Sequence, residues 1–179
     1  MSQFASKQFE GKTYTFEHLQ PMGFALTLNV RGQAEPHPLA IDITFGSHCF
    51  TEAFDATVHG DHHRYTHQNE LRAFDTQRYA CSLHLPQVMK SITSGMIYKS
   101  DENYTYVSQI KVEDGDARLT DYSIFFSLNR PAGDDRTIPA SRLLLYVKSG
   151  YPTALKPRGP NARNWRFKAL ASERAGIGR

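Results

Sequence analysis

Alternating hydrophobic and polar residues predict most of the strands of this chain. On one face of a predicted strand lie Phe24, Leu26, Leu28 and Val30. A second strand is predicted over 39–45, so residues 24–45 indicate an antiparallel hairpin with a long loop. Residues 12–18 also alternate. Further strands are predicted over 104–112, 119–128 and 141–148, with strong turn signals at 113–116 and 129–135.

One segment has helical spacing instead. Apolar residues recur every three or four positions at Leu85, Val88, Met89, Ile92 and Met96. Pro86 suits the first turn of a helix, so we predict a helix over 83–98 that Gly95 ends or frays. Residues 51–80 give a mixed signal. The expected fold is α+β, in which the N-terminal hairpin and a C-terminal three-stranded meander form an antiparallel sheet against one main helix.

The length of 179 residues favours a single domain. We place this domain at 1–152, followed by a basic tail at 153–179. Within the tail, 164–171 is a candidate short helix anchored by Trp165 and Phe167.

Charge is divided unevenly along the chain. Residues 151–179 hold seven Lys and Arg against a single acid, Glu173, which leaves 14 basic and 17 acidic residues elsewhere. The formal net charge of +3 therefore combines −3 in the body with +6 near the C-terminus. This asymmetry favours binding of a polyanion, here nucleic acid, at one end of the molecule.

Several classes of protein are disfavoured. No apolar run approaches the roughly 18–20 residues of a membrane span, and residues 1–12 lack the apolar region of a secretion signal. Two cysteines make no disulfide framework, so we expect a reduced, cytoplasmic protein. The phosphate-binding, metalloprotease, esterase and dinucleotide motifs are missing, and no paired carboxylates indicate a two-metal nuclease. We expect no cofactor.

Polar residues gather where two predicted strands end. His48 follows the second strand, and Lys148, Ser149 and Tyr151 follow the last one. Cleaving an RNA phosphodiester without a metal requires a base, an acid and donors for the phosphorane charge. The candidate set is His48, Arg78, Tyr79, Ser82, Lys148, Ser149 and Tyr151. The alternative is structural, with His48 capping a loop, Arg78 in a surface ion pair and Tyr151 packed.

Zinc is a weaker prediction. Cys49, Cys81 and His84, with His48, are zinc-ligand types, and Cys81 and His84 have a ligand-like spacing. Adjacent residues on a strand point to opposite faces, however, and buried free cysteine is common packing.

A histidine cluster is the other possible metal site. It comprises His59, His62, His63 and His67, with Asp55 or Asp61 as further ligands. We favour a polar surface loop that happens to be rich in histidine.

The sequence Tyr-Val-Lys-Ser-Gly-Tyr-Pro at 146–152 resembles the strand-to-corner motif of the barnase–EndoU–colicin–RelE superfamily of small metal-independent ribonucleases. Arg78-Tyr79 with 85–89 is similar to the segment that opens a helix in phage-associated branches. The resemblance covers 78–152. It implies Ser149 and Tyr151 as site residues and, more loosely, His48. Gly150 stands where Ala is commoner, which we expect to matter little.

We therefore predict a metal-independent endoribonuclease of toxin or phage type. In this prediction His48 acts as base or acid, and Tyr151 acts as its partner or as a phosphate donor. Arg78 and Lys148 stabilise charge, and Ser149 binds a phosphate oxygen. The RNA backbone is held by Lys156, Arg158, Arg163, Trp165, Arg166 and Lys168. The alternative is a non-catalytic binding or inhibitor protein of a mobile element. RNA and a cognate protein inhibitor are the expected partners, with no membrane; the oligomeric state is not predicted.

Overall fold

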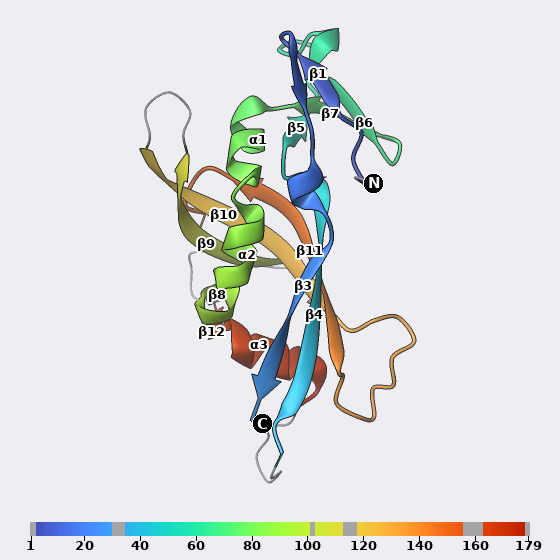
Figure 1. Ribbon diagram of the computed structural model, residues 1–179, viewed down its shortest axis with the longest axis vertical. Coiled ribbons are helices and arrows are strands. Elements are labelled where there is room, and N and C mark those ends of the chain that lie inside the picture. Colours follow the sequence, from blue (N-terminus) through green and yellow to red (C-terminus); the bar gives the residue numbers. More distant parts are fainter. Residues whose placement is uncertain (1–2, 30–34, 101–102, 113–117, 156–162, 178–179) are drawn as a thin grey trace.

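The long predicted strands come together in one sheet. The structure is a computed structural model that describes residues 3–29, 35–100, 103–112, 118–155 and 163–177. Its main sheet has seven strands in the order β12-β8-β9-β10-β11-β4-β3 and curls into a half-barrel (Figure 1). The strands are β3 (Met22–Leu28), β4 (His37–His48), β8 (Met96–Ser100), β9 (Asn103–Val112), β10 (Arg118–Asn129), β11 (Arg142–Tyr151) and β12 (Arg163–Arg166).

The α+β class is confirmed, but the prediction of a purely antiparallel sheet is wrong. The β3–β4 hairpin and the β9-β10-β11 meander are antiparallel, as expected. The two parts join through β4 and β11, which run parallel, with Ile41 opposite Leu143. Turn residues specify only neighbouring strands, whereas these strands are about a hundred residues apart and no local pattern sets their direction.

The sheet is built on alternate residues that point into one core. Leu39, Ile41 and Ile43 of β4 are fully buried, and so are Leu143 and Val147 of β11. Two consecutive helices lie across this face, α1 (Thr76–Ser82) and α2 (Leu85–Ser91) (Figure 1). Burial of these apolar faces holds the helices against the half-barrel.

The single helix predicted over 83–98 is wrong in extent. After α2 comes a 3-10 turn (Ile92–Ser94), and Met96 already belongs to β8. Gly95 ends the helical segment in an extended conformation, and a Cβ there would lie 2.4 Å from the Tyr106 ring. Asp75 begins α1, which was not predicted, by accepting a hydrogen bond from the Arg78 amide.

A smaller β region covers the end of β4 at which His48 lies (Figure 1). It contains a hairpin of β1 (Lys7–Phe9) and β2 (Lys12–Tyr14), and a sheet of β5 (Thr51–Ala53), β7 (Glu70–Phe74) and β6 (Arg64–His67). Short 3-10 turns lie at Glu17–Leu19 and Asp61–His63. The region packs on an aromatic cluster that includes Phe16 and Phe50, whose ring centroids are 4.0 Å apart. This packing fixes β7 beside the end of β4.

The described part of the C-terminal segment is integrated into the fold, unlike the separate tail that was predicted. Residues 163–166 form β12 at the edge of the main sheet, paired with β8. The helix then begins later than expected, as α3 (Phe167–Ala175), and buries Phe167, Leu170 and Ala171. Among the described residues, no helix is both long and apolar enough to cross a membrane.

Candidate active site around His48

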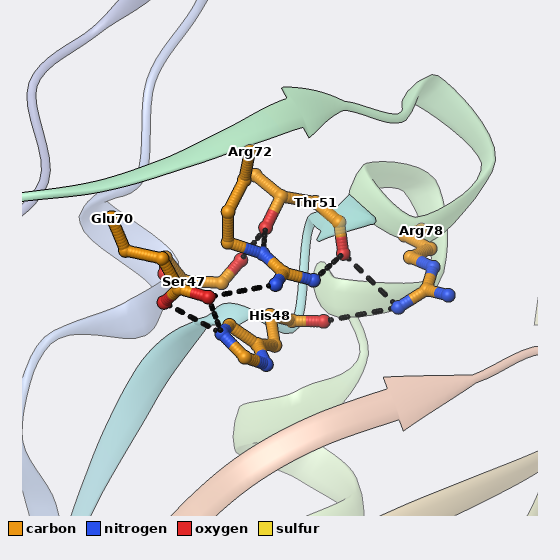
Figure 2. A network of polar contacts seen from close by, with 6 residues as sticks. All are labelled: Ser47, His48, Thr51, Glu70, Arg72 and Arg78. Atoms are coloured by element: carbon orange, nitrogen blue, oxygen red, sulfur yellow. Dashed lines mark hydrogen bonds and ion pairs between the residues drawn. The ribbon is translucent and has the colours of Figure 1, made fainter. Parts of the chain in front are cut away.

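His48, the last residue of β4, is hydrogen-bonded to Glu70, the first residue of β7. Its Nε2 lies 2.9 Å and 3.1 Å from the two carboxylate oxygens (Figure 2). Both side chains are partly exposed, at 39% and 51%. The turn between β6 and β7 consists of Gln68 and Asn69, which both have positive φ, as in the tight hairpins that reverse a chain over two residues. This turn sets Glu70 opposite His67 and next to His48.

Arg72 holds the Glu70 carboxylate in place. One guanidinium nitrogen of Arg72 lies 3.0 Å from Glu70, and its Nε donates to the Thr51 hydroxyl at 2.7 Å. Thr51 donates in turn to the Ser47 carbonyl at 2.8 Å, so three strands are tied together (Figure 2). The hydrogen bond from His48, followed by those from Arg72, lowers the pKa of Glu70. The carboxylate is therefore ionised at neutral pH.

Arg78 links the backbone beside His48 to Tyr151. One of its terminal nitrogens donates to the carbonyls of Thr51 at 3.0 Å and His48 at 3.5 Å (Figure 2). The guanidinium carbon lies 4.3 Å from the centroid of the Tyr151 ring, a cation–π contact. The side chain is only 13% exposed, so it acts mainly as a brace for the strand ends.

A shift in the register of β4 and β11 brings Ser149 opposite His48. Val147 pairs with Phe45 and Ser149 with His48, so two residues of β4, Gly46 and Ser47, lie opposite the single residue Lys148 on this side. On the other side Val147 and Ser149 pair with consecutive residues of β10, which leaves Lys148 as the inserted residue. Bulges of this kind redirect side chains and are frequent next to active sites. Three predicted residues thus meet at one place in the fold: His48, Ser149 and the bulged Lys148.

A cavity of about 380 Å³ opens beside the His48–Glu70 pair. Its lining is Gln3, Thr44, Phe45, Gly46, Ser47, His48, His67, Gln68, Glu70 and Tyr146. Tyr146 lies across the bare backbone of Gly46, where a Cβ would be 2.5 Å from the phenol oxygen. Burial is the main cause that raises the pKa of Tyr146, so the phenol keeps its proton at neutral pH. Of the predicted catalytic residues, only His48 is among the described residues that line this cavity.

Comparison with known proteins gives a family. A family model described as the YjaZ family matches residues 6–175. The chain belongs to the YjaZ family. No curated protein and no solved structure shows significant similarity to it.

In this YjaZ family protein, Tyr79 lies outside the candidate site. Its hydroxyl donates to the Thr15 carbonyl at 3.0 Å and its ring packs edge-on against Tyr14. Ser82 hydrogen-bonds the Tyr79 carbonyl at 2.7 Å and His18 at 2.8 Å. Both side chains therefore join α1 to the N-terminal segment and do not face the cavity.

The zinc prediction finds no geometric support among the described residues, which hold no group of three side chains placed to bind a metal ion. Cys49 is fully buried with its thiol 3.8 Å from the Val147 carbonyl, and burial raises its pKa to about 12. His84 lines a separate groove between α2 and β9. The thiol of Cys49 is thus a packing group that keeps its proton.

The histidine cluster is held by local contacts. His59 bonds Glu52 at 2.9 Å through Nε2, and its Nδ1 accepts from the Asp55 amide at 3.0 Å. The rings of His62 and His63 lie against each other with centroids 4.0 Å apart. His67 alone lines the cavity.

The basic residues near the C-terminus lie far from His48. Arg163, Arg166 and Lys168 are exposed at β12 and the start of α3, and Trp165 packs edge-on near Tyr104. At its other end α3 is bonded to the residues that precede β11, whereas His48 pairs near the end of β11. Eight residues of β11 separate the C-terminal end of α3 from the position opposite His48, which corresponds to roughly 25 Å along the strand. Lys156 and Arg158 lie outside the described residues.

Sequence reasoning missed Glu70, Arg72 and Tyr146. Glu70 and Arg72 lie in the segment of mixed signal, and β7 is too short to show a clear period. Tyr146 reads as one more apolar residue of a buried strand. The only available signal was the alternation of β11, which places Tyr146 on the face opposite Leu145 and Val147.

Proposed function

We propose that this YjaZ family protein is a metal-independent endoribonuclease whose active site is the cavity beside His48. The supporting observation is the His48–Glu70 pair, which Arg72 orders from behind. A partly exposed imidazole bonded to an ionised carboxylate is an arrangement suited to general acid–base catalysis. The proposal is also consistent with the resemblance of residues 146–152 to the corner motif of the ribonuclease superfamily.

The proposed reaction is attack by the ribose 2′-oxygen on the adjacent phosphorus. Glu70 accepts a hydrogen bond from His48 Nε2–H, so the lone pair of the neutral imidazole is on Nδ1, which takes the proton of the 2′-hydroxyl. The O2′–P bond forms as the bond to the 5′-oxygen breaks, giving a 2′,3′-cyclic phosphate. Tyr146, which keeps its proton, donates to the departing oxygen, and the Lys148 ammonium offsets the phosphorane charge.

Arg78 and Tyr151 have supporting roles in this scheme. Arg78 fixes the His48 carbonyl and stacks on Tyr151, so the pair sets the position of the His48 backbone. We therefore assign them as positioning residues and expect their loss to reduce the rate less than loss of His48.

A second candidate function is non-catalytic binding of nucleic acid or of a partner protein. The observation that favours it is that Arg72 and Arg78 already donate hydrogen bonds to Glu70, Thr51 and the His48 carbonyl. Much of their donor capacity is therefore not free to bind a substrate phosphate. On this alternative the basic residues of β12 and α3 bind the partner and His48 is dispensable.

The test is incubation of the protein with total RNA and a tRNA pool in EDTA. His48→Ala and Glu70→Gln should both remove cleavage, because each removes one half of the pair. Arg163→Ala, at the far end of the sheet, is the matched control and should cleave a short RNA at the wild-type rate. RNA that stays intact with wild-type protein, or equal cleavage by His48→Ala, refutes the proposal, and retarded but intact RNA supports the binding alternative.

A further inference from the structure

A second pocket, of about 290 Å³, lies at the C-terminal end of α3. Its lining is Arg130, Arg136, Glu173, Arg174 and Gly176. Two of these side chains come from the loop between β10 and β11, and the others come from α3 and its cap. Three guanidinium groups therefore border one hollow whose lining contains a single carboxylate, and one of the three, that of Arg130, is paired with Asp134 outside the lining.

Arg130 is a fixed part of this pocket. Its side chain is 7% exposed, and its Nε lies 2.6 Å from an Asp134 carboxylate oxygen. One terminal nitrogen donates to the carbonyls of Asp135 at 2.5 Å and Ile138 at 2.9 Å. The other, NH1, has no hydrogen-bond partner among the described residues and faces Gly176, where a Cβ would lie 3.3 Å away. The guanidinium is thus held rigidly with one donor group left over.

The arginines are not needed to cap α3. Basic side chains at a helix C-terminus often bind its last carbonyls, but here backbone amides already do so. Gly176 donates to Glu173 at 3.1 Å, Ile177 to Ser172 at 3.0 Å, and Ala140 to Ala175 at 2.8 Å. The last carbonyls of α3 therefore do not need the guanidinium groups of Arg136 and Arg174, although Arg174 also forms a side-chain hydrogen bond with Tyr104. Arg174 is positioned by the Tyr104 ring, 5.5 Å from its guanidinium carbon.

We propose that this pocket binds a phosphate group. Guanidinium forks match phosphate oxygens in pairs, and such charge-assisted bonds are stronger than neutral ones. The volume exceeds that of a bare phosphate and leaves room for part of the ester attached to it. The site lies at the start of β11, at the opposite end from His48, and does not depend on the proposed ribonuclease activity.

The test is a titration of isotope-labelled protein followed by amide NMR. Inorganic phosphate and a nucleoside 5′-monophosphate should each shift the Gly176 and Ile177 signals to saturation. Arg136→Ala and Arg174→Ala should each weaken binding at least tenfold, since each removes a charge-assisted pair. Arg64→Ala, at an exposed arginine of β6 that belongs neither to the pocket nor to the predicted nucleic-acid-binding residues, should bind as the wild type does.

A short oligonucleotide without terminal phosphates distinguishes the two sources of the group. Binding of this strand with the same dependence on Arg136 assigns the site to backbone phosphodiesters. Binding of the monophosphate alone assigns it to a terminal phosphate. The proposal is overturned if neither probe gives saturable shifts at Gly176, or if Arg136→Ala and Arg174→Ala bind as tightly as the wild type. Unchanged amide signals in β4 and β11 verify that the variants fold.

Discussion

Gly150 provides a quantitative test of the packing beneath the candidate site. A Cβ at this position would lie 2.2 Å from the phenol oxygen of Tyr122 and 2.6 Å from the adjacent ring carbon. Tyr122 is completely buried and has no space into which to move. We therefore predict that Gly150→Ala is strongly destabilising, contrary to the expectation from the family resemblance that alanine is tolerated there.

Gly46 offers the matched comparison. Its Cβ would lie 2.5 Å from the phenol oxygen of Tyr146, a similar clash on the neighbouring strand. Tyr146 is 43% exposed, however, and can rotate toward solvent. Overpacking a rigid core costs typically 1–3 kcal/mol, and the contacts at Gly150 place it near about 3 kcal/mol. Gly46→Ala should cost less, about 1 kcal/mol, because Tyr146 yields and alanine restricts the unfolded chain, while the contact of the Cβ with the Lys148 carbonyl at 3.1 Å needs only a small shift.

The assay is urea unfolding of both variants, with the free energy of unfolding compared at equal slopes. Gly60→Ala is the control for a glycine next to a mobile side chain, because its Cβ would meet only the exposed ring of His62, at 3.0 Å. Equal losses for Gly150→Ala and Gly46→Ala would refute the reasoning that neighbour mobility sets the cost. A neutral Gly150→Ala would show that Tyr122 does not pack where the structure places it.

The remaining predictions concern buried polar groups and the spacing of the two sites. Burial lowers the pKa of His18 to about 4 in the folded protein, against about 6.5 in the unfolded chain. The unfolded chain therefore takes up the proton at higher pH, and the folded protein loses stability as the pH falls from about 6.5 to about 4. At pH 5 the lost unfolding free energy is about 2 kcal/mol, which partial exposure of His18 reduces to about 1 kcal/mol. The urea midpoint of His18→Gln should not fall between pH 7 and pH 5 in this way. An equal fall in the variant would contradict the prediction. The buried Tyr122 hydroxyl has no hydrogen-bond partner within the part of the chain that the structure describes, so Tyr122→Phe should leave the melting temperature unchanged or raise it. A loss of unfolding free energy above about 1 kcal/mol would contradict this. If both proposals hold, one RNA strand can reach from the phosphate pocket to His48 only if it is longer than roughly eight nucleotides, which span about 25 Å when stacked. Arg136→Ala should therefore slow cleavage of such RNAs and leave cleavage of tetramers unchanged. Equal effects on both lengths would exclude binding of one strand at both sites.

The sequence predicted those parts of the fold that local patterns determine. Alternation located β9, β10 and β11 to within a few residues, because each has one buried face and a turn at its end. The parallel pairing of β4 with β11 left no such trace. The helix over 83–98 failed at Gly95, because its close approach to Tyr106 turns an apolar helical period into the start of a strand.

In the candidate site, too, the residues at strand ends were predictable from local patterns and the others were not. His48 and Ser149 were found because strand ends are visible in sequence, and the register then set them opposite each other. Glu70 was not found, because it is placed by a two-residue turn of Gln and Asn that lacks the Gly usual at such positions. Tyr79 was assigned to the site through its neighbour Arg78, but successive helical residues point in different directions and only Arg78 reaches His48.

The largest change to the functional hypothesis concerns where the positive charge lies. The charge asymmetry of the sequence suggested one basic surface that holds RNA over the catalytic residues. In the structure the described basic residues of β12 and α3 lie at one end of the sheet, and the His48 cavity lies at the other. Arg72 and Arg78, the arginines beside His48, bind Glu70 and backbone carbonyls, so the local charge of the cavity is largely balanced. Under the proposed ribonuclease function, electrostatic attraction and acid–base chemistry are therefore assigned to different ends of β11. We then expect salt to weaken the association with RNA more than it slows the chemical step.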